Sequence, residues 1–187
     1  MISERIKIEG GWDDLTWKYI QGFSSALELV PIYYIYNEDE KTFHLEHVFA
    51  YELYYRWKVI LSNYIDNPEA LMLNAELTKH YHEIERYKFP DMVLHGNYSK
   101  EDKQFVICEI KSTKNRIEDE YLIKDMESLK RGIRDLHYKC GLFIYLGNNF
   151  QYMIEKLRGI LSSFDNPIGR KIIFVGVNCE LPHYELL

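Results

Sequence analysis

A continuous apolar run at residues 141–147, GLFIYLG, sets the strongest limit on how this chain can fold. A strand with no polar position on either side must be covered on both faces, as in a sheet between two layers of helices. An amphipathic stretch from Ile117 to Tyr138 precedes the run, and another from Phe150 to Phe164 follows it. A further apolar strand pattern covers 171–177. The sequence therefore predicts an α/β layered domain.

One helix and three strands are expected before these elements. Helical spacing runs from Thr42 to Tyr64, with Thr42 as the expected N-cap. Strand patterns cover about 70–77, 89–95 and 104–111. The polar connection between the last two suits an antiparallel hairpin. The expected order is helix, three strands, helix, strand, followed by one more helix–strand unit.

The chain of 187 residues is long enough for one well-buried domain and too short for two ordinary ones. We interpret 1–41 as an N-terminal helical and β extension packed on the core, and 42–187 as the domain itself. A helix is expected to start at Asp13 or Asp14, where acidic residues suit a helix N-terminus. The β-prone run at 29–36 either covers the core or pairs with a second copy of the chain.

Charged residues gather at the ends of the two hairpin strands. Pro90-Asp91 opens one strand, and Glu109-Ile110-Lys111 closes the other. Because alternate side chains of a strand share a face, Glu109 and Lys111 should point the same way while Ile110 points into the core. Asp91 on the neighbouring strand would complete a cluster of two carboxylates and one ammonium.

Such a cluster has the chemistry of a divalent-metal site. Two converging carboxylates repel each other unless positive charge lies between them. Their hard oxygens suit Mg²⁺, or Mn²⁺, and the backbone carbonyl of Ile110 offers a further ligand. An ion held there can lower the pKa of a bound water and neutralise charge on a phosphoryl group. Lys111 could orient that water, accept its proton or stabilise the pentavalent phosphorus.

The motifs Pro90-Asp91 and Glu109-Ile110-Lys111, in this order of elements, resemble the PD-(D/E)xK superfamily of restriction-endonuclease-like nucleases. The resemblance covers about 42–147. It implies an αβββαβ core whose mixed central sheet is flanked by helices. It also implies a Mg²⁺-dependent phosphodiesterase acting on nucleic acid, DNA before RNA. Catalytic residues would be Lys111, Asp91 and Glu109.

The resemblance further implies an acidic residue on the helix before the strands. Glu52 lies along the apolar stripe of that helix, between Val48 and Arg56, and so should point toward the protein. We favour Glu52 as the supporting or second-metal acid and keep Glu46 as the alternative. Asp125 lies on the apolar side of the next helix, and we interpret it as an acid satisfied by a nearby base or backbone donor rather than as a site residue.

The net charge of −6 restricts how the chain would hold nucleic acid. Acidic residues are in excess outside 111–140, whereas that segment has 8 basic and 6 acidic residues. Phosphate contacts are therefore expected from its basic residues, with a solvated basic face as the alternative. These are Lys114, Arg116, Lys130, Arg131 and Arg134. Tight binding would depend on a partner protein or a second subunit.

Two other classes of function remain open on sequence grounds. One is a non-catalytic module of the same fold that binds or assembles with a partner, and the other is a homodimeric interaction protein. Three widely spaced cysteines are typical of reduced thiols, and no apolar stretch is long enough to span a bilayer. A cytoplasmic protein without a membrane partner is expected.

Overall fold

The computed structural model describes residues 2–37, 42–43, 45–64, 71–75, 90–96, 103–113, 117–164, 168 and 170–187. Its main feature is one six-stranded sheet in the order β3-β4-β5-β6-β7-β8. These strands are β3 (Leu71–Ala75), β4 (Met92–Gly96), β5 (Gln104–Ser112), β6 (Cys140–Leu146), β7 (Ile172–Val177) and β8 (His183–Leu186). A separate antiparallel pair consists of β1 (Tyr36–Asn37) and β2 (Thr42–Phe43).

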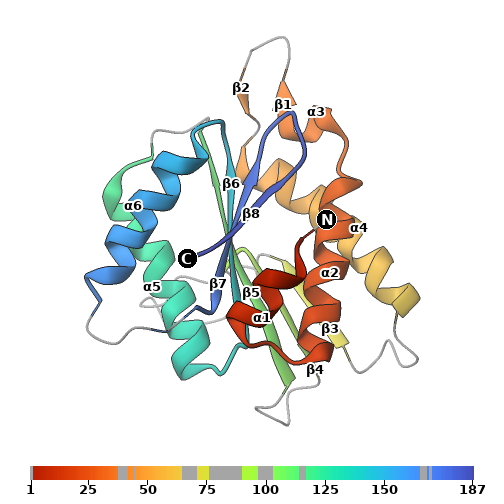
Figure 1. Cartoon of the computed structure of the whole chain (residues 1–187). Helices are drawn as coiled ribbons and strands as arrows, with labels where there is room; N and C mark the ends of the chain where they lie inside the picture. Colours follow the sequence, from red (N-terminus) through yellow and green to blue (C-terminus); the bar gives the residue numbers. More distant parts are fainter. Residues whose placement is uncertain are drawn as a thin grey trace, which may run out of the picture.

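Helices cover both faces of the sheet. They are α1 (Glu4–Gly10), α2 (Asp14–Glu28), α3 (Ile32–Ile35), α4 (Glu46–Tyr64), α5 (Asp119–Asp135) and α6 (Phe150–Ser162). Figure 1 shows α5 and α6 on one side of the sheet and α1, α2 and α4 on the other. The chain therefore has a mixed α/β fold with a six-stranded mixed sheet between helices. No helix in the described ranges is long and apolar enough to cross a membrane.

The strand directions follow from the connections. β4 is antiparallel to both β3 and β5, and the antiparallel pairing predicted for the strands at 89–95 and 104–111 is confirmed as that of β4 and β5. β5, β6 and β7 are parallel, with α5 and α6 as the crossover helices between them. The register pairs Lys111 with Tyr145, so β5 and β6 end side by side. β8 then returns antiparallel to β7 at the edge of the sheet.

Two hydrophobic clusters fill the spaces between sheet and helices. One lies against α2 and α4 and includes Phe23 and Trp57, and the other lies against α5 and α6 and includes Leu122 and Phe143. All seven residues of β6 are buried, which confirms that the apolar run is covered on both faces. The sheet is thus held from both sides, and its strand ends become fixed positions for polar side chains.

Two details of the N-terminal half were predicted wrongly. Of the run at 29–36, residues Ile32–Ile35 form the single helical turn α3, with Pro31 at its N-cap, and only Tyr36 belongs to a strand. Proline's fixed φ suits a helix start, and this overrides the β propensity of the residues that follow. Thr42 does not cap a helix, because it lies in β2 and α4 begins at Glu46. Phe43 instead packs edge-on against Tyr36, with ring centroids 5.4 Å apart.

Candidate metal centre

The candidate site lies where β5 runs past the start of β4. The described ladder between these strands ends at the pair Met92 and Cys108, whereas β5 continues to Ser112. Two carboxylates accept the backbone N–H groups of this continuation. Asp91 Oδ2 accepts from the Ile110 N–H at 2.6 Å, and Glu46 Oε1 accepts from the Ser112 N–H at 3.2 Å. Side-chain oxygens therefore line the edge of β5 where a strand would otherwise pair.

Asp91 binds the main chain on both sides of Glu109. Its own N–H donates to the Cys108 carbonyl at 3.1 Å, and its carboxylate accepts from the Ile110 N–H. Glu109 itself is fully buried. Burial raises the pKa of the Cys108 thiol well above its usual value, and the charges of Cys140, Asp91 and Glu109 add to this effect. The structure thus brings together the two acids that the sequence separates.

Lys111 lies between two carboxylates that come from opposite faces of the sheet. Its Nζ is 3.0 Å from Asp125 Oδ2 on α5 and 3.6 Å from Glu46 Oε1 on α4. The Lys111 side chain is 14% exposed, and that of Asp125 is 0% exposed. Ile110, between Glu109 and Lys111, is buried in the core as its place in the strand predicts. At the end of β5, Glu109 and Ile110 are therefore buried, and the Lys111 ammonium lies beside Asp125.

The structure places Glu46, and not Glu52, beside Lys111. Glu52 pairs with Arg56 one helical turn farther on, at 2.6 Å. Its charge also raises the pKa of the Tyr34 hydroxyl on α3. Glu46 lies in the first turn of α4, which begins next to the end of β5. Glu46, the alternative candidate for the supporting acid, therefore lies at the cluster. Glu52, the favoured candidate, pairs with Arg56 instead.

Asp125 is the residue that sequence reasoning undervalued. The prediction that a nearby base satisfies it is confirmed, but that base is Lys111 itself. The available signal was its spacing on α5, where it shares the buried side of the helix with Leu122, Met126 and Leu129. An acid among apolar residues at helical spacing points toward the sheet, although the spacing alone does not say which strand residue it meets.

Three of the basic residues proposed to hold phosphates, Lys130, Arg131 and Arg134, lie apart from this cluster. Lys130 packs over the Phe164 ring at 4.4 Å, and Arg134 pairs with Asp135 at 2.6 Å. Together with Arg131 they belong to the last turns of α5, and the chain beyond them returns to the start of β5. Lys114 and Arg116 lie outside the described residues.

The donor set of the cluster fits a hard divalent ion. Among the described residues, no three His, Cys, Asp or Glu side chains are grouped as a complete metal site. The predicted set also included Glu52, which pairs with Arg56 instead. Without it, the set has two such side chains, Asp91 and Glu109, and the carbonyl oxygen of Ile110. Mg²⁺ is commonly bound by one or two carboxylates and keeps several waters, so the absence of a third acid ligand is compatible with it.

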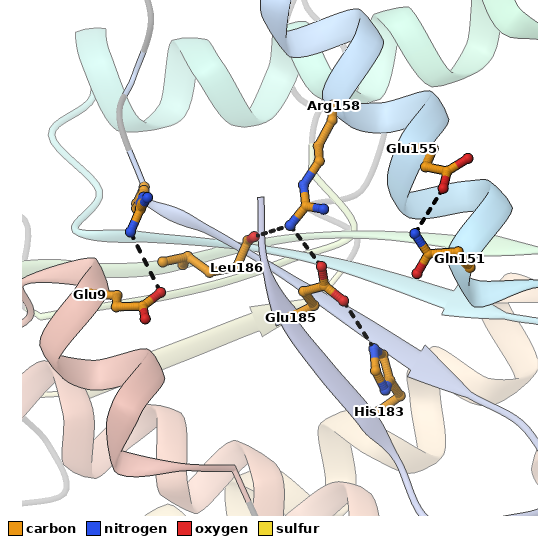
Figure 2. Close-up of polar contacts among 8 residues, drawn as sticks. Glu9, Gln151, Glu155, Arg158, His183, Glu185 and Leu186 are labelled. Carbon is orange, nitrogen blue, oxygen red and sulfur yellow. Dashed lines mark hydrogen bonds and ion pairs between the residues drawn. The ribbon is translucent and has the colours of Figure 1, made fainter.

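A cavity of about 530 Å³ lies elsewhere, among residues of α1, α6 and β8. Figure 2 shows that its charged side chains engage one another. Arg158 donates to Glu185 at 2.7 Å and to the Leu186 carbonyl at 3.0 Å, and His183 lies 3.4 Å from the same glutamate. No residue of the candidate metal centre lines this cavity. The cavity and the candidate metal centre are therefore separate features of the fold.

The comparisons with protein-family models, curated proteins and solved structures gave no match to this chain, so the assignment of a function depends on the chemistry of the site.

Proposed function

We propose that the chain is a divalent-metal-dependent nuclease with a restriction-endonuclease-like core, hydrolysing phosphodiester bonds of nucleic acid, with DNA favoured. The order α4, β3, β4, β5, α5, β6 supports this core, as do its antiparallel, antiparallel and parallel pairings. One observation carries the proposal. Asp91 contacts the backbone on both sides of Glu109, and Lys111 follows Glu109 by two residues in β5.

Three groups would hold the ion: the carboxylates of Asp91 and Glu109 and the carbonyl oxygen of Ile110. The N–H and C=O of a strand residue point to the same side. Because the Ile110 N–H donates to Asp91, its carbonyl oxygen faces the side on which Asp91 lies. When bound, the ion would neutralise charge on the phosphate and make water more acidic.

The reaction is the hydrolysis of a phosphodiester. A water oxygen bonds to phosphorus in line with the leaving oxygen, and the bond from phosphorus to that oxygen breaks with its electron pair. The water's proton passes to solvent, and the leaving oxygen takes one from solvent, which gives a phosphomonoester and a hydroxyl. Lys111 would contribute its positive charge and N–H donors to a non-bridging phosphate oxygen, since charge develops there in the transition state.

A binding or assembly module is the second candidate. It is favoured by one observation, three exposed tyrosines on two helices that contact each other, Tyr33 of α3 and Tyr51 and Tyr55 of α4. Tyrosine is enriched in protein interfaces, so these side chains suit a partner protein or a second copy. Under this alternative, the acids at the end of β5 would be structural.

The test combines metal binding with cleavage. Calorimetric titration with Mg²⁺ and Mn²⁺ should give binding in the wild type and in Lys111→Met, and none in Asp91→Asn. A gel assay on single-stranded, duplex and branched DNA and on RNA should show cleavage by the wild type, slow residual cleavage by Lys111→Met and none by Asp91→Asn. The loss in Lys111→Met should be on the order of 10²–10³-fold.

Matched controls come from an exposed ion pair on α5. Glu120 and Lys124 lie 2.6 Å apart, and their side chains are 72% and 53% exposed. Glu120→Gln and Lys124→Met remove the same kinds of charge away from the cluster and should bind metal and cleave as the wild type does. A wild type that binds neither ion and cleaves none of these substrates would refute the nuclease and leave the binding module.

A further inference from the structure

A carboxylate is buried on the inner side of α5, facing the end of β5. The Asp125 side chain is 0% exposed, and its helix neighbours Leu122, Met126 and Leu129 are fully buried apolar residues. Removing a carboxylate from water is costly unless a positive charge or several donors compensate it. For Asp125, the positive charge comes from Lys111.

The contact joins strand β5 to helix α5. Lys111 Nζ lies 3.0 Å from Asp125 Oδ2, which is within range of a charge-assisted hydrogen bond. On the other side of the ammonium, Glu46 Oε1 lies 3.6 Å away and also accepts the Ser112 N–H at 3.2 Å. The lysine nitrogen is therefore fixed between a helix on each face of the sheet.

Such a fixed position matters because a lysine side chain is flexible. It carries its charge on a four-carbon stem and loses rotamer entropy when it is ordered. A cation that stabilises a reacting phosphate must already be in place, because reorganisation during the reaction lowers its effect. A buried carboxylate on a rigid helix supplies that placement before substrate arrives.

We propose that Asp125 is a positioning residue, which holds the Lys111 ammonium where it meets the scissile phosphate. This inference depends on the proposed function, because it assigns a role within the same site. Asp125 touches neither substrate nor metal in this role, and it acts only through Lys111. Substrate binding and metal binding should therefore not depend on Asp125. The rate of cleavage in the enzyme–substrate complex should depend on it.

The competing role is structural, with Lys111 present only to neutralise a buried acid. The two roles differ in what Asp125→Asn changes. Asparagine keeps the size of the side chain and removes its charge. Under the structural role, this variant alters thermal stability and leaves kcat unchanged. Under the positioning role, it lowers kcat at saturating substrate and leaves KM and the affinity for Mg²⁺ unchanged.

The experiment measures kcat, KM, Mg²⁺ affinity and the thermal midpoint for the wild type, Asp125→Asn, Lys111→Met and the double variant. We expect Asp125→Asn to lower kcat on the order of 10²-fold, as for removal of one preorganised electrostatic group. The double variant should be no slower than Lys111→Met alone, because residues that act as a unit are not additive. The control is Asp119→Asn, since Asp119 is on the same helix, 76% exposed and paired with Lys156.

Each outcome decides between the proposals. Wild-type kcat in Asp125→Asn, or effects of the two single variants that multiply in the double variant, overturns the positioning role and leaves the nuclease intact. A wild type that cleaves nothing overturns both. If circular dichroism shows Asp125→Asn to be unfolded, Asp125→Glu is measured instead. Its longer side chain should displace the ammonium and lower kcat at constant KM, and an unchanged kcat refutes the inference.

Discussion

At the scale of single residues, Asp13 shows how one side chain ties the N-terminal segment to the sheet. As the N-cap of α2, it accepts from the Thr16 N–H at 2.8 Å and the Thr16 hydroxyl at 2.9 Å. It also accepts from Lys139 Nζ at 2.9 Å, just before β6. Partial burial alone would raise the pKa of Asp13, but the hydrogen bonds from Thr16 and Lys139 outweigh it and lower the pKa from 3.8 to about 2.

This lowered pKa predicts an acid-sensitive contribution to stability. Because the folded-state pKa lies below the unfolded one, the contribution is complete above about pH 4 and is lost as the pH falls toward about 2. Asp13→Ala should lower the free energy of unfolding by about 1 kcal/mol at neutral pH, a typical loss for an N-cap. Urea unfolding of both proteins between pH 2 and 7 should show the two stabilities converging at the acid end.

The neighbouring Asp14 provides the control for this prediction. Its side chain is 95% exposed and pairs with Lys7, so Asp14→Ala removes a surface ion pair and not the cap. We expect a smaller loss, within about 0.5 kcal/mol. A difference between Asp13→Ala and the wild type that stays constant down to pH 2 contradicts the assigned role of the Asp13 carboxylate.

Residue by residue, the sequence predicted which residues the hairpin places at the end of β5 better than the contacts that other elements make with them. Asp91, Glu109 and Lys111 were identified from strand alternation and the hairpin, which are local properties. The choice between Glu46 and Glu52 depended on where α4 begins relative to the end of β5, which only the packed fold determines. The partner of Asp125 was hidden for the same reason, because it lies on another element.

At the scale of elements, the strength of the pattern decided what could be predicted. The confirmed elements are strongly patterned, such as α5 with its apolar face and β6 with its seven buried residues. Three elements were missed or assigned wrongly, namely α1, α3 and the edge strand β8. Their conformation depends more on the surface against which they pack than on a period of their own.

Two glycines, one on each crossover helix, give a test of how closely these helices approach the sheet. A Cβ at Gly132 of α5 would lie 2.4 Å from Ile107 Cδ1 of β5, whereas Gly159 of α6 has no atom within 4 Å of that position. Alanine at either site raises helix propensity by up to about 1 kcal/mol. At Gly132, overpacking against a buried isoleucine costs about 1–3 kcal/mol and should exceed that gain.

The same substitution should therefore have opposite effects on the two helices. Gly132→Ala should lower the thermal midpoint, and Gly159→Ala should raise it, by amounts corresponding to about 0.5–1 kcal/mol in the second case. Differential scanning calorimetry of both variants and the wild type measures this. If Gly132→Ala is as stabilising as Gly159→Ala, Gly132 lies farther from Ile107 of β5 than the structure shows.

At the scale of the whole molecule, the fold separates the basic residues from the cluster of acids. Arg134 lies roughly 13 Å farther along α5 than Asp125. The chain beyond α5 returns to the start of β5, where Lys139 donates its N–H to the Gln104 carbonyl at 3.1 Å. The distribution of charge along the sequence had grouped Arg134 with the cluster at the end of β5, but proximity in sequence does not bring its side chain to that cluster.

This separation predicts which cations contribute to nucleic-acid binding. Lys114 and Arg116 follow Lys111 by three and five residues in the sequence. If they contact phosphates at the candidate site, replacing both by alanine should weaken binding at all sequences. It should also reduce the slope of log Kd against log salt by about 2, or about 1 for each contact.

The matched variant replaces Arg131 and Arg134, which removes the same number of charges from the opposite end of α5. It should leave the salt slope within about 0.5 of the wild-type value, because neither side chain would release counterions from nucleic acid bound near Lys111. Fluorescence anisotropy with labelled DNA over a series of salt concentrations measures both slopes. Equal reductions of the salt slope in the two variants would mean that binding follows the general charge of residues 111–140. A larger reduction of the slope on losing Arg131 and Arg134 would place the binding surface at the C-terminal end of α5.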